Sequence, residues 1–177
     1  MARAQPGWPG RHHSKQHHKV ISMELADILS QDSIIACAKV ASKRQLLQQL
    51  ADRASEIAGI DAQLVFETLL SREQLGSTGL GNGIAIPHGK IKGLPGVVAV
   101  FARLAQPIDF DSVDDQPVDL VVMLLAPEGS GADHLKALSR VARLLRAEGV
   151  VDQLRSTRDE TRLREILTTP LEAINAA

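Results

Sequence analysis

Two near-continuous apolar runs, Val97–Leu104 and Val118–Leu125, constrain the fold of this chain more than any other feature of its sequence. A strand with one face in water alternates apolar and polar residues, whereas a strand covered on both faces is apolar at almost every position. The runs therefore predict two central strands with other elements packed on both faces. A shorter apolar segment, Ser33–Ala38, is a further strand candidate, after a helical turn at 23–30.

Helical patterns precede these two runs. Apolar residues recur at helical spacing between Ser42 and Gly59. Ser42 and Gln45 form a capping-box pattern at the start of this stretch, and Gly59 is a typical helix stop. Asp61 is predicted to cap a second helix that ends near Gln74.

Two further helices are predicted after the second run. Asp133 is expected to cap the first of them, which Gly149 ends, and Thr157 with Glu160 forms another capping-box pattern. Helices before and after the buried strands predict an α/β fold, in which helices cover both faces of the sheet. With no internal repeat and no linker, residues 23–177 are expected to form a single compact domain.

Composition excludes several classes of function. Lys and Arg number 20 against 21 Asp and Glu, and aromatic residues make up 2%, so neither charge nor stacking favours binding of nucleic acid. Cys37 alone cannot form an internal disulfide or a usual cysteine zinc site, which fits a reducing compartment. No apolar stretch is long enough to insert into a membrane, so we expect a cytoplasmic protein.

Residues 1–22 differ in kind from the rest of the chain. They contain basic but no acidic residues, several Pro and Gly residues that disfavour a helix, and the histidines His12, His13, His17 and His18. They lack the apolar stretch of a secretory signal. We interpret them as a disordered N-terminal extension. A translation start assigned too early would produce such a segment. A metal-binding or basic docking arm is the alternative, although no third ligand recurs at fixed spacing.

The strongest candidate for chemistry is His88. A glycine-rich loop, Gly76–Gly83, and a short predicted strand, Ile84–Ile86, lead into Pro87 and His88. Pro87 fixes one backbone torsion and favours an extended preceding residue, so His88 is expected on a stiff strand end. A neutral imidazole keeps a lone pair and can act as a nucleophile that carries a phosphoryl group. Backbone N–H groups nearby can bind an anion; the candidates are Ser77, Thr78, Gly79, Gly81, Asn82, Gly83 and Gly89.

His134 and Arg72 are candidate partners of His88. His134 follows Asp133 at a predicted helix start, where unpaired N–H groups favour an anion and the imidazole itself can donate a hydrogen bond to a phosphoryl oxygen. Arg72 lies just before the glycine loop, and its guanidinium fork can hold phosphate oxygens. Each also has a structural interpretation. His88 is then a packed side chain, His134 a surface residue, Arg72 the complement of its helix end, and the glycines are only turns.

The segment from Arg72 to Lys90 closely resembles the active-site region of enzyme IIA, the fructose/mannitol-type family of the bacterial phosphoenolpyruvate-dependent phosphotransferase system. The glycine spacing within it fits neither a Rossmann fingerprint nor a P-loop. The similarity is greatest to the nitrogen-regulatory branch, PtsN. It extends over most of residues 23–177 and includes Pro107–Phe110 and Asp115–Asp119.

The resemblance implies a compact domain with a mixed sheet between helices, the EIIA type-2 domain. It implies that His88 is the phosphorylated residue, that His134 helps to stabilise the phosphoryl group and that Arg72 approaches the same site. In this family the phosphoryl group is carried on the ring nitrogen distal to the backbone. The phosphohistidine donor is already reactive, so neither a cofactor nor a metal is expected.

The resemblance also implies partners. The donor would be an HPr-like phosphocarrier, called NPr in the nitrogen branch, that is fed by enzyme I. Regulatory targets in that branch include potassium transport systems and sensor kinases. An apolar rim around the acceptor histidine is expected to receive the donor, and its candidates are Leu80, Ile84 and Leu94.

Two alternatives remain open. One is a sugar-uptake IIA that passes the phosphoryl group to a IIB domain; we prefer a regulatory phosphocarrier because no IIB or membrane IIC domain is recognisable in the sequence. The other is a metal-dependent hydrolase that uses His88, His134 and Asp133. Its ligand spacing is poor, because adjacent residues of a helix point apart.

Overall fold

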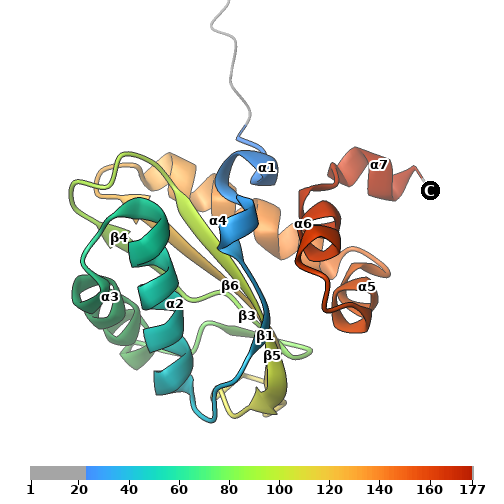
Figure 1. Ribbon diagram of the computed structural model, residues 1–177, viewed down its shortest axis with the longest axis horizontal. Helices are drawn as coiled ribbons and strands as arrows, with labels where there is room; N and C mark the ends of the chain where they lie inside the picture. Colours follow the sequence, from blue (N-terminus) through green and yellow to red (C-terminus); the bar gives the residue numbers. More distant parts are fainter. Residues whose placement is uncertain (1–22, 177) are drawn as a thin grey trace, which may run out of the picture.

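The computed structural model describes residues 23–176, which form one α/β domain (Figure 1). Its six-stranded sheet has the order β1-β5-β6-β3-β2, and β4 also pairs with β6. The strands are β1 (Ile34–Ala38), β2 (Gly79–Gly81), β3 (Ile84–Ala85), β4 (His88–Ile91), β5 (Val98–Ile108) and β6 (Val118–Pro127). The helices are α1 (Leu25–Ile28), α2 (Lys43–Ala58), α3 (Ala62–Gln74), α4 (Gly131–Arg146), α5 (Val150–Ser156), α6 (Glu160–Thr168) and α7 (Leu171–Asn175), with a 3-10 turn at Gln31–Ser33.

The two apolar runs form the central strands, as predicted. β5 and β6 are antiparallel, whereas β1 is parallel to β5, and β3 and β4 are parallel to β6, so the sheet is mixed. Successive β6 side chains enter different cores. Val121 and Met123 pack with α2 and α3, whereas Leu120 and Leu124 pack with α4, α5 and α6. This two-sided burial explains why β6 is apolar almost throughout.

The predicted ends of the helices before β2 are confirmed. Ser42 Oγ accepts a hydrogen bond from Gln45 N at 3.2 Å, and Gly59 ends α2 with φ 66°. The Gln45 side chain bonds Ala41 N rather than Ser42 N, so only half of the capping box forms. Asp61 Oδ1 accepts from Gln63 N at 3.0 Å and starts α3.

Three predicted helix ends after β6 are wrong. α4 begins at Gly131 after Ser130, and Asp133 lies in its first turn, where an acidic residue favours the helix dipole without being the cap. Gly149 precedes α5 with φ 77° instead of ending α4. The cap of α6 is Asp159, whose Oδ1 accepts from Arg162 N at 2.7 Å. Thr157 instead accepts from Asp159 N, in a local turn of the kind that short polar side chains make with the backbone.

The glycine-rich segment is not simply a loop. β2 and β3 form a tight antiparallel hairpin, turned by Asn82 at φ 55° and Gly83 at φ 78°. Glycine is needed at the second of these positions because that torsion strains other residues. The hairpin places Thr78 beside Ile86, whose N–H donates to the Thr78 carbonyl at 3.0 Å.

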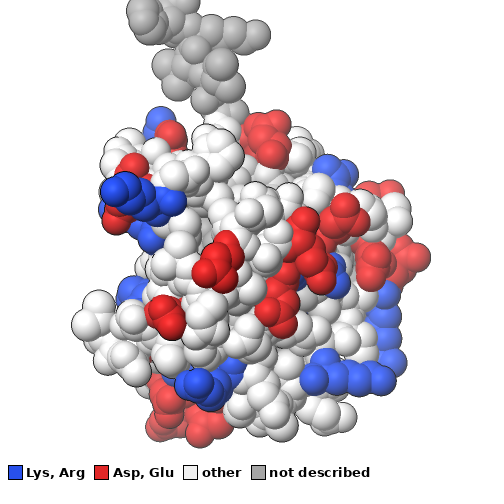
Figure 2. Space-filling view, turned by 60° about the vertical axis from the view of Figure 1, so that its left-hand side comes forward, with Lys and Arg blue, Asp and Glu red and all other residues white. Residues whose placement is uncertain are grey.

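Residues 1–22, predicted to be a disordered extension, lie outside the described residues. Within 23–176 no helix is long and apolar enough to cross a membrane. On the face shown in Figure 2, acidic and basic side chains are interspersed, and no broad basic surface is visible there.

Candidate functional site

His88 is the first residue of β4 and pairs with Leu124 of the central strand β6. Directly paired residues point to the same side of a sheet, so His88 faces the layer that contains α4, as Leu124 does. The next residue, Gly89, faces α3. A Cβ atom there would lie 2.6 Å from Thr68 Cγ2, so the close approach of α3 requires glycine. Helix packing thus accounts for a glycine at position 89.

The ring of His88 has a defined hydrogen bond. Its Nδ1 lies 2.8 Å from the carbonyl oxygen of Ile86. Because a carbonyl can only accept, Nδ1 must carry the proton, and the neutral ring then has its lone pair on Nε2. The nitrogen distal to the backbone is therefore the one available as a nucleophile.

His134 lies beside His88. It is the fourth residue of α4, and its ring centroid is 5.4 Å from that of His88, with the rings tilted by 55°. The side chain is buried, and its Nδ1 has no hydrogen-bond partner within residues 23–176. A buried polar atom without a partner is costly, so this nitrogen is a candidate for binding a ligand. The structure thus brings together two histidines that are 46 positions apart in the chain.

Both rings are held neutral. Burial lowers the pKa of His88 below its ordinary 6.5, and the charge of Arg72 lowers it further, while the Ile86 carbonyl and Glu73 act in the opposite direction. Burial also lowers the pKa of His134, with smaller contributions from His88 and Lys90. At neutral pH, the His88 lone pair is therefore free of a proton.

Arg72 lies in the last turn of α3, and its Nη1 donates to the Gly76 carbonyl at 2.8 Å. This contact fits the helix-end interpretation. The positive charge nevertheless lies close enough to affect the His88 pKa, and the other N–H groups of the fork make no hydrogen bond within residues 23–176. Both roles are therefore compatible with its position.

Three predicted phosphate-binding residues near the start of the hairpin are engaged elsewhere. Ser77 Oγ donates to the Phe110 carbonyl at 2.8 Å. The backbone N of Thr78 donates to the Glu73 carboxylate at 3.1 Å, and the Thr78 hydroxyl bonds the same carboxylate. A Cβ atom on Gly79 would collide with Ser112. These contacts give the segment a structural role in joining α3, the hairpin and the loop after β5.

The hairpin tip, which contains Gly81, Asn82 and Gly83, lies away from the histidines. Ile84 pairs with Leu120 whereas His88 pairs with Leu124, a separation along β6 of roughly 13 Å. Asn82 N donates to Asp114 at 2.9 Å, and Asn82 O accepts from Arg155. A side chain at Gly83 would collide with Arg155. The hairpin turn is therefore held by its contacts with Asp114 and Arg155.

The predicted apolar rim is also largely wrong. Ile84 and Leu94 are buried core residues, each 4% exposed, and only Leu80 is partly exposed, at the hairpin strand. The exposed leucines that lie next to candidate site residues in the chain are Leu75, at the end of α3, and Leu135, beside His134. Sequence patterns could not separate core from rim, because both require apolar residues.

Two charged residues near the histidines were not predicted. Glu73, next to Arg72, is buried, and its charge acts to raise the pKa of His88. Lys90, two residues after His88 on β4, acts to lower the pKa of His134. The alternation of a strand was a usable signal for Lys90, because residues 88 and 90 share a face. No sequence signal distinguishes Glu73 from an exposed acidic residue at a helix end.

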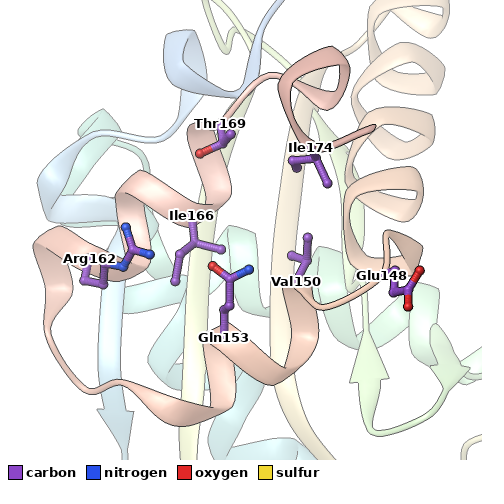
Figure 3. Close-up of a pocket in the computed structure, with 7 residues that line it drawn as sticks. All are labelled: Glu148, Val150, Gln153, Arg162, Ile166, Thr169 and Ile174. Carbon is purple, nitrogen blue, oxygen red and sulfur yellow. The ribbon is translucent and has the colours of Figure 1, made fainter. Parts of the chain in front are cut away.

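The hydrolase alternative finds no ligand set in the described part of the chain. No three His, Cys, Asp or Glu side chains within 23–176 come together as a metal site, and Asp133 is exposed beside the buried His134. A cavity of about 480 Å³ lies between α5, α6 and α7 (Figure 3), and its lining contains neither histidine.

This chain is similar to known proteins both in sequence and in fold. A family model described as "Phosphoenolpyruvate-dependent sugar phosphotransferase system, EIIA 2" matches residues 27–169. A nitrogen regulatory protein of Bradyrhizobium diazoefficiens is 51% identical over 148 residues, which cover 84% of this chain and 97% of that protein. A fructose-specific EIIA component of Haloferax volcanii is 35% identical over 133 residues, which cover 75% and 86%.

The crystal structure of nitrogen regulatory protein IIA-Ntr from Neisseria meningitidis has a similar fold. The TM-score is 0.78 at 35% identity, with 81% of this chain and 99% of that chain covered. The resemblance inferred from Arg72–Lys90, including its nitrogen-regulatory character, is thereby confirmed. The chain belongs to the EIIA 2 family of the phosphoenolpyruvate-dependent sugar phosphotransferase system.

Proposed function

We propose that this chain is a regulatory phosphohistidine carrier in which Nε2 of His88 accepts a phosphoryl group from an HPr-like protein. The observation that carries the proposal is the hydrogen bond from Nδ1 of His88 to the Ile86 carbonyl. That bond leaves the lone pair on Nε2, beside a second, buried neutral imidazole. Family membership supplies the chemistry, since EIIA components take part in phosphotransfer.

The transfer needs positioning and charge stabilisation more than acid–base chemistry. The bond between phosphorus and the donor's ring nitrogen breaks as the bond to Nε2 forms, and the donor ring recovers its lone pair. The Nδ1 proton stays on His88, hydrogen-bonded to Ile86. The ring thereby gains positive charge while the phosphoryl oxygens bring negative charge.

His134 and Arg72 act on the transferred group in this proposal. The unpartnered ring of His134 donates a hydrogen bond to a phosphoryl oxygen through whichever nitrogen carries its proton. Arg72 lies on α3, across the sheet from α4, and offers the unused part of its fork to the same oxygens. Preorganised donors of this kind stabilise transition-state charge without reorganising.

We assign the chain to the nitrogen-regulatory branch, with NPr as donor, enzyme I upstream and regulation of targets such as potassium transport systems or sensor kinases. The 51% identity to a nitrogen regulatory protein over 97% of its length supports this branch. The alternative, sugar uptake through a IIB domain, is supported by the 35% identity to a fructose-specific EIIA component.

The test is intact mass after incubation with phosphoenolpyruvate, enzyme I and NPr. We expect one acid-labile phosphoryl group on the full chain and none on His88→Ala. A variant with His12, His13, His17 and His18 all changed to Ala is the matched control and should be phosphorylated like the parent chain. Phosphorylation of folded His88→Ala would contradict the assignment. Rapid transfer onward to a fructose-specific IIB domain would favour the sugar-uptake alternative.

A further inference from the structure

Glu73 is a buried carboxylate that the mechanism above does not use. Its side chain is 3% exposed and forms an ion pair with Lys43 at 3.1 Å. It also accepts hydrogen bonds from Thr78 N at 3.1 Å and from the Thr78 hydroxyl. Burying a charge is costly unless it is paired, and here the pairing is nearly complete.

Helix stability does not explain this carboxylate. Glu73 lies in the last turn of α3, where the helix dipole disfavours negative charge. A Gln or an apolar residue would avoid that repulsion and the cost of desolvation. The carboxylate of Glu73 therefore serves contacts outside α3.

An unbroken chain of hydrogen bonds leads from Glu73 to the ring of His88. The carboxylate holds Thr78 through its backbone N and its hydroxyl. The Thr78 carbonyl accepts from Ile86 N at 3.0 Å, and the Ile86 carbonyl accepts from Nδ1 of His88 at 2.8 Å. Thr78 and Ile86 are 5% and 3% exposed, so water does not compete readily for these bonds.

We propose that Glu73 is a positioning residue for phosphoryl transfer, which fixes the Ile86 carbonyl and thereby the ring orientation and tautomer of His88. This inference rests on the proposed function of His88. The charge of Glu73 has a second effect, because it favours the positive charge that the ring gains as Nε2 is phosphorylated. In the unphosphorylated protein the charge of Glu73 acts to raise the His88 pKa, whereas burial and Arg72 lower it.

The competing explanation is that Glu73 only joins α3 to the hairpin. Lys43 also contacts Asp111 at 3.2 Å, so the cluster does tie α2 to the loop after β5. A purely structural role predicts that a folded variant without the charge leaves the tautomer and the Nδ1 hydrogen bond of His88 unchanged. A positioning role predicts a larger change at His88 than at His134, whose pKa depends on burial, His88 and Lys90.

The experiment compares Glu73→Gln with Glu67→Gln in the full chain by NMR of the imidazole nitrogens across pH. Glu67 is the matched control, because it is on the same helix, is exposed, and bonds only Gln63. In Glu73→Gln the His88 pKa should fall, since a nearby negative charge is lost. The His134 pKa should change less than that of His88, because Glu73 acts on it through His88. Both rings in Glu67→Gln should stay as in the parent chain.

A second pair of variants separates the hydrogen bonds from the charge. Thr78→Val removes the hydroxyl but keeps the backbone bonds, so the Nδ1–H signal of His88 should shift, and Thr78→Ser should restore it. These variants decide the matter if Glu73→Gln does not fold.

The rate of phosphorylation by NPr should fall several-fold in Glu73→Gln, with the concentration of NPr that gives half-maximal rate unchanged. The NMR readout needs no donor, so a parent chain that accepts no phosphoryl group would refute the proposed function and leave this test intact. A folded Glu73→Gln, or failing that Thr78→Val, whose His88 signals match the parent chain would overturn the positioning role.

Discussion

Two polar clusters lie five residues apart along β6, at Asp119 and Leu124, and differ in how their polar atoms are satisfied. Around Asp119, Arg155 donates to both carboxylate oxygens at 2.8 Å and to Asn82 O at 2.8 Å. Near Leu124, the buried Nδ1 of His134, beside His88, has no hydrogen-bond partner in the described part of the chain. The first cluster pairs its polar groups within the fold, whereas the second leaves one buried nitrogen unpaired within residues 23–176.

The largest expected effect that separates the two clusters is that of His88→Gln. The variant loses the nucleophilic nitrogen, so phosphorylation should disappear, while the free energy of unfolding should change by less than about 1 kcal/mol because the side chain is only half-buried. Intact mass and urea unfolding measure the two quantities. A large loss of stability would mean that His88 is a core residue, and the two clusters would then not differ in their contribution to stability.

Arg72→Ala should have the next largest effect. Loss of charged hydrogen bonds to the phosphoryl group should raise the barrier to transfer by about 1–3 kcal/mol, roughly a five- to 150-fold slower rate. Arg72→Lys, which keeps the charge but not the fork, should recover part of the rate. Quench-flow phosphorylation by NPr provides the measurement. A rate equal to that of the parent chain in both variants would leave Arg72 with the helix-end role alone.

Arg155→Ala tests the satisfied cluster. It removes a bidentate ion pair whose partners are 36% and 24% exposed, so solvent screening limits the expected loss of stability to about 1 kcal/mol. Phosphorylation of His88 should be unaffected, because Asp119 lies roughly 16 Å along β6 from Leu124, the strand partner of His88. Chemical unfolding and phosphorylation rate are measured on the same sample. Slower transfer without loss of stability would link Arg155 to the site.

His134→Phe should shift stability in the opposite direction. It replaces a ring with an unpartnered buried nitrogen by one without polar atoms, so the free energy of unfolding should rise by up to about 1 kcal/mol. Transfer should slow, since the second imidazole is lost. A variant that is both less stable and equally fast would show that the nitrogen of His134 is satisfied in solution.

The smallest expected effect is that of pH. Both histidines have a pKa below the ordinary 6.5 in the folded chain, so they contribute stability that is fully present above the unfolded pKa. That contribution is lost as the pH falls through the folded pKa values. Unfolding measured between pH 7.5 and 5 (roughly the range that brackets histidine titration) should show a decline that is smaller in His134→Phe. A decline of equal size in both would assign it to other groups.

Much of the fold was predictable, because its decisive signals are local. The continuous apolar runs identified β5 and β6, and Ser42, Gly59 and Asp61 marked helix ends correctly. The errors at Asp133 and Thr157 arose where several polar residues in a row could satisfy the first turn of a helix. The choice among them depends on how the preceding chain approaches the helix.

The site was predictable in its chemistry but not in its arrangement. His88, His134 and Arg72 stood out by residue type and local context, and the structure brings the first two into contact and Arg72 within electrostatic range. Gly81, Asn82 and Gly83 stood out equally and are remote. A glycine pattern looks the same whether it accommodates a ligand or a neighbouring side chain, such as that of Arg155.

The sequence by itself determined the buried sheet, the family and the identity of the candidate acceptor, because these depend on patterns within short stretches of chain. Only the tertiary structure decided which nitrogen of His88 is free, which histidine nitrogen lacks a partner and that Glu73 is buried behind Thr78. Those properties depend on contacts between α3, α4 and β4. Such contacts arise from packing across the sheet, which no local pattern encodes.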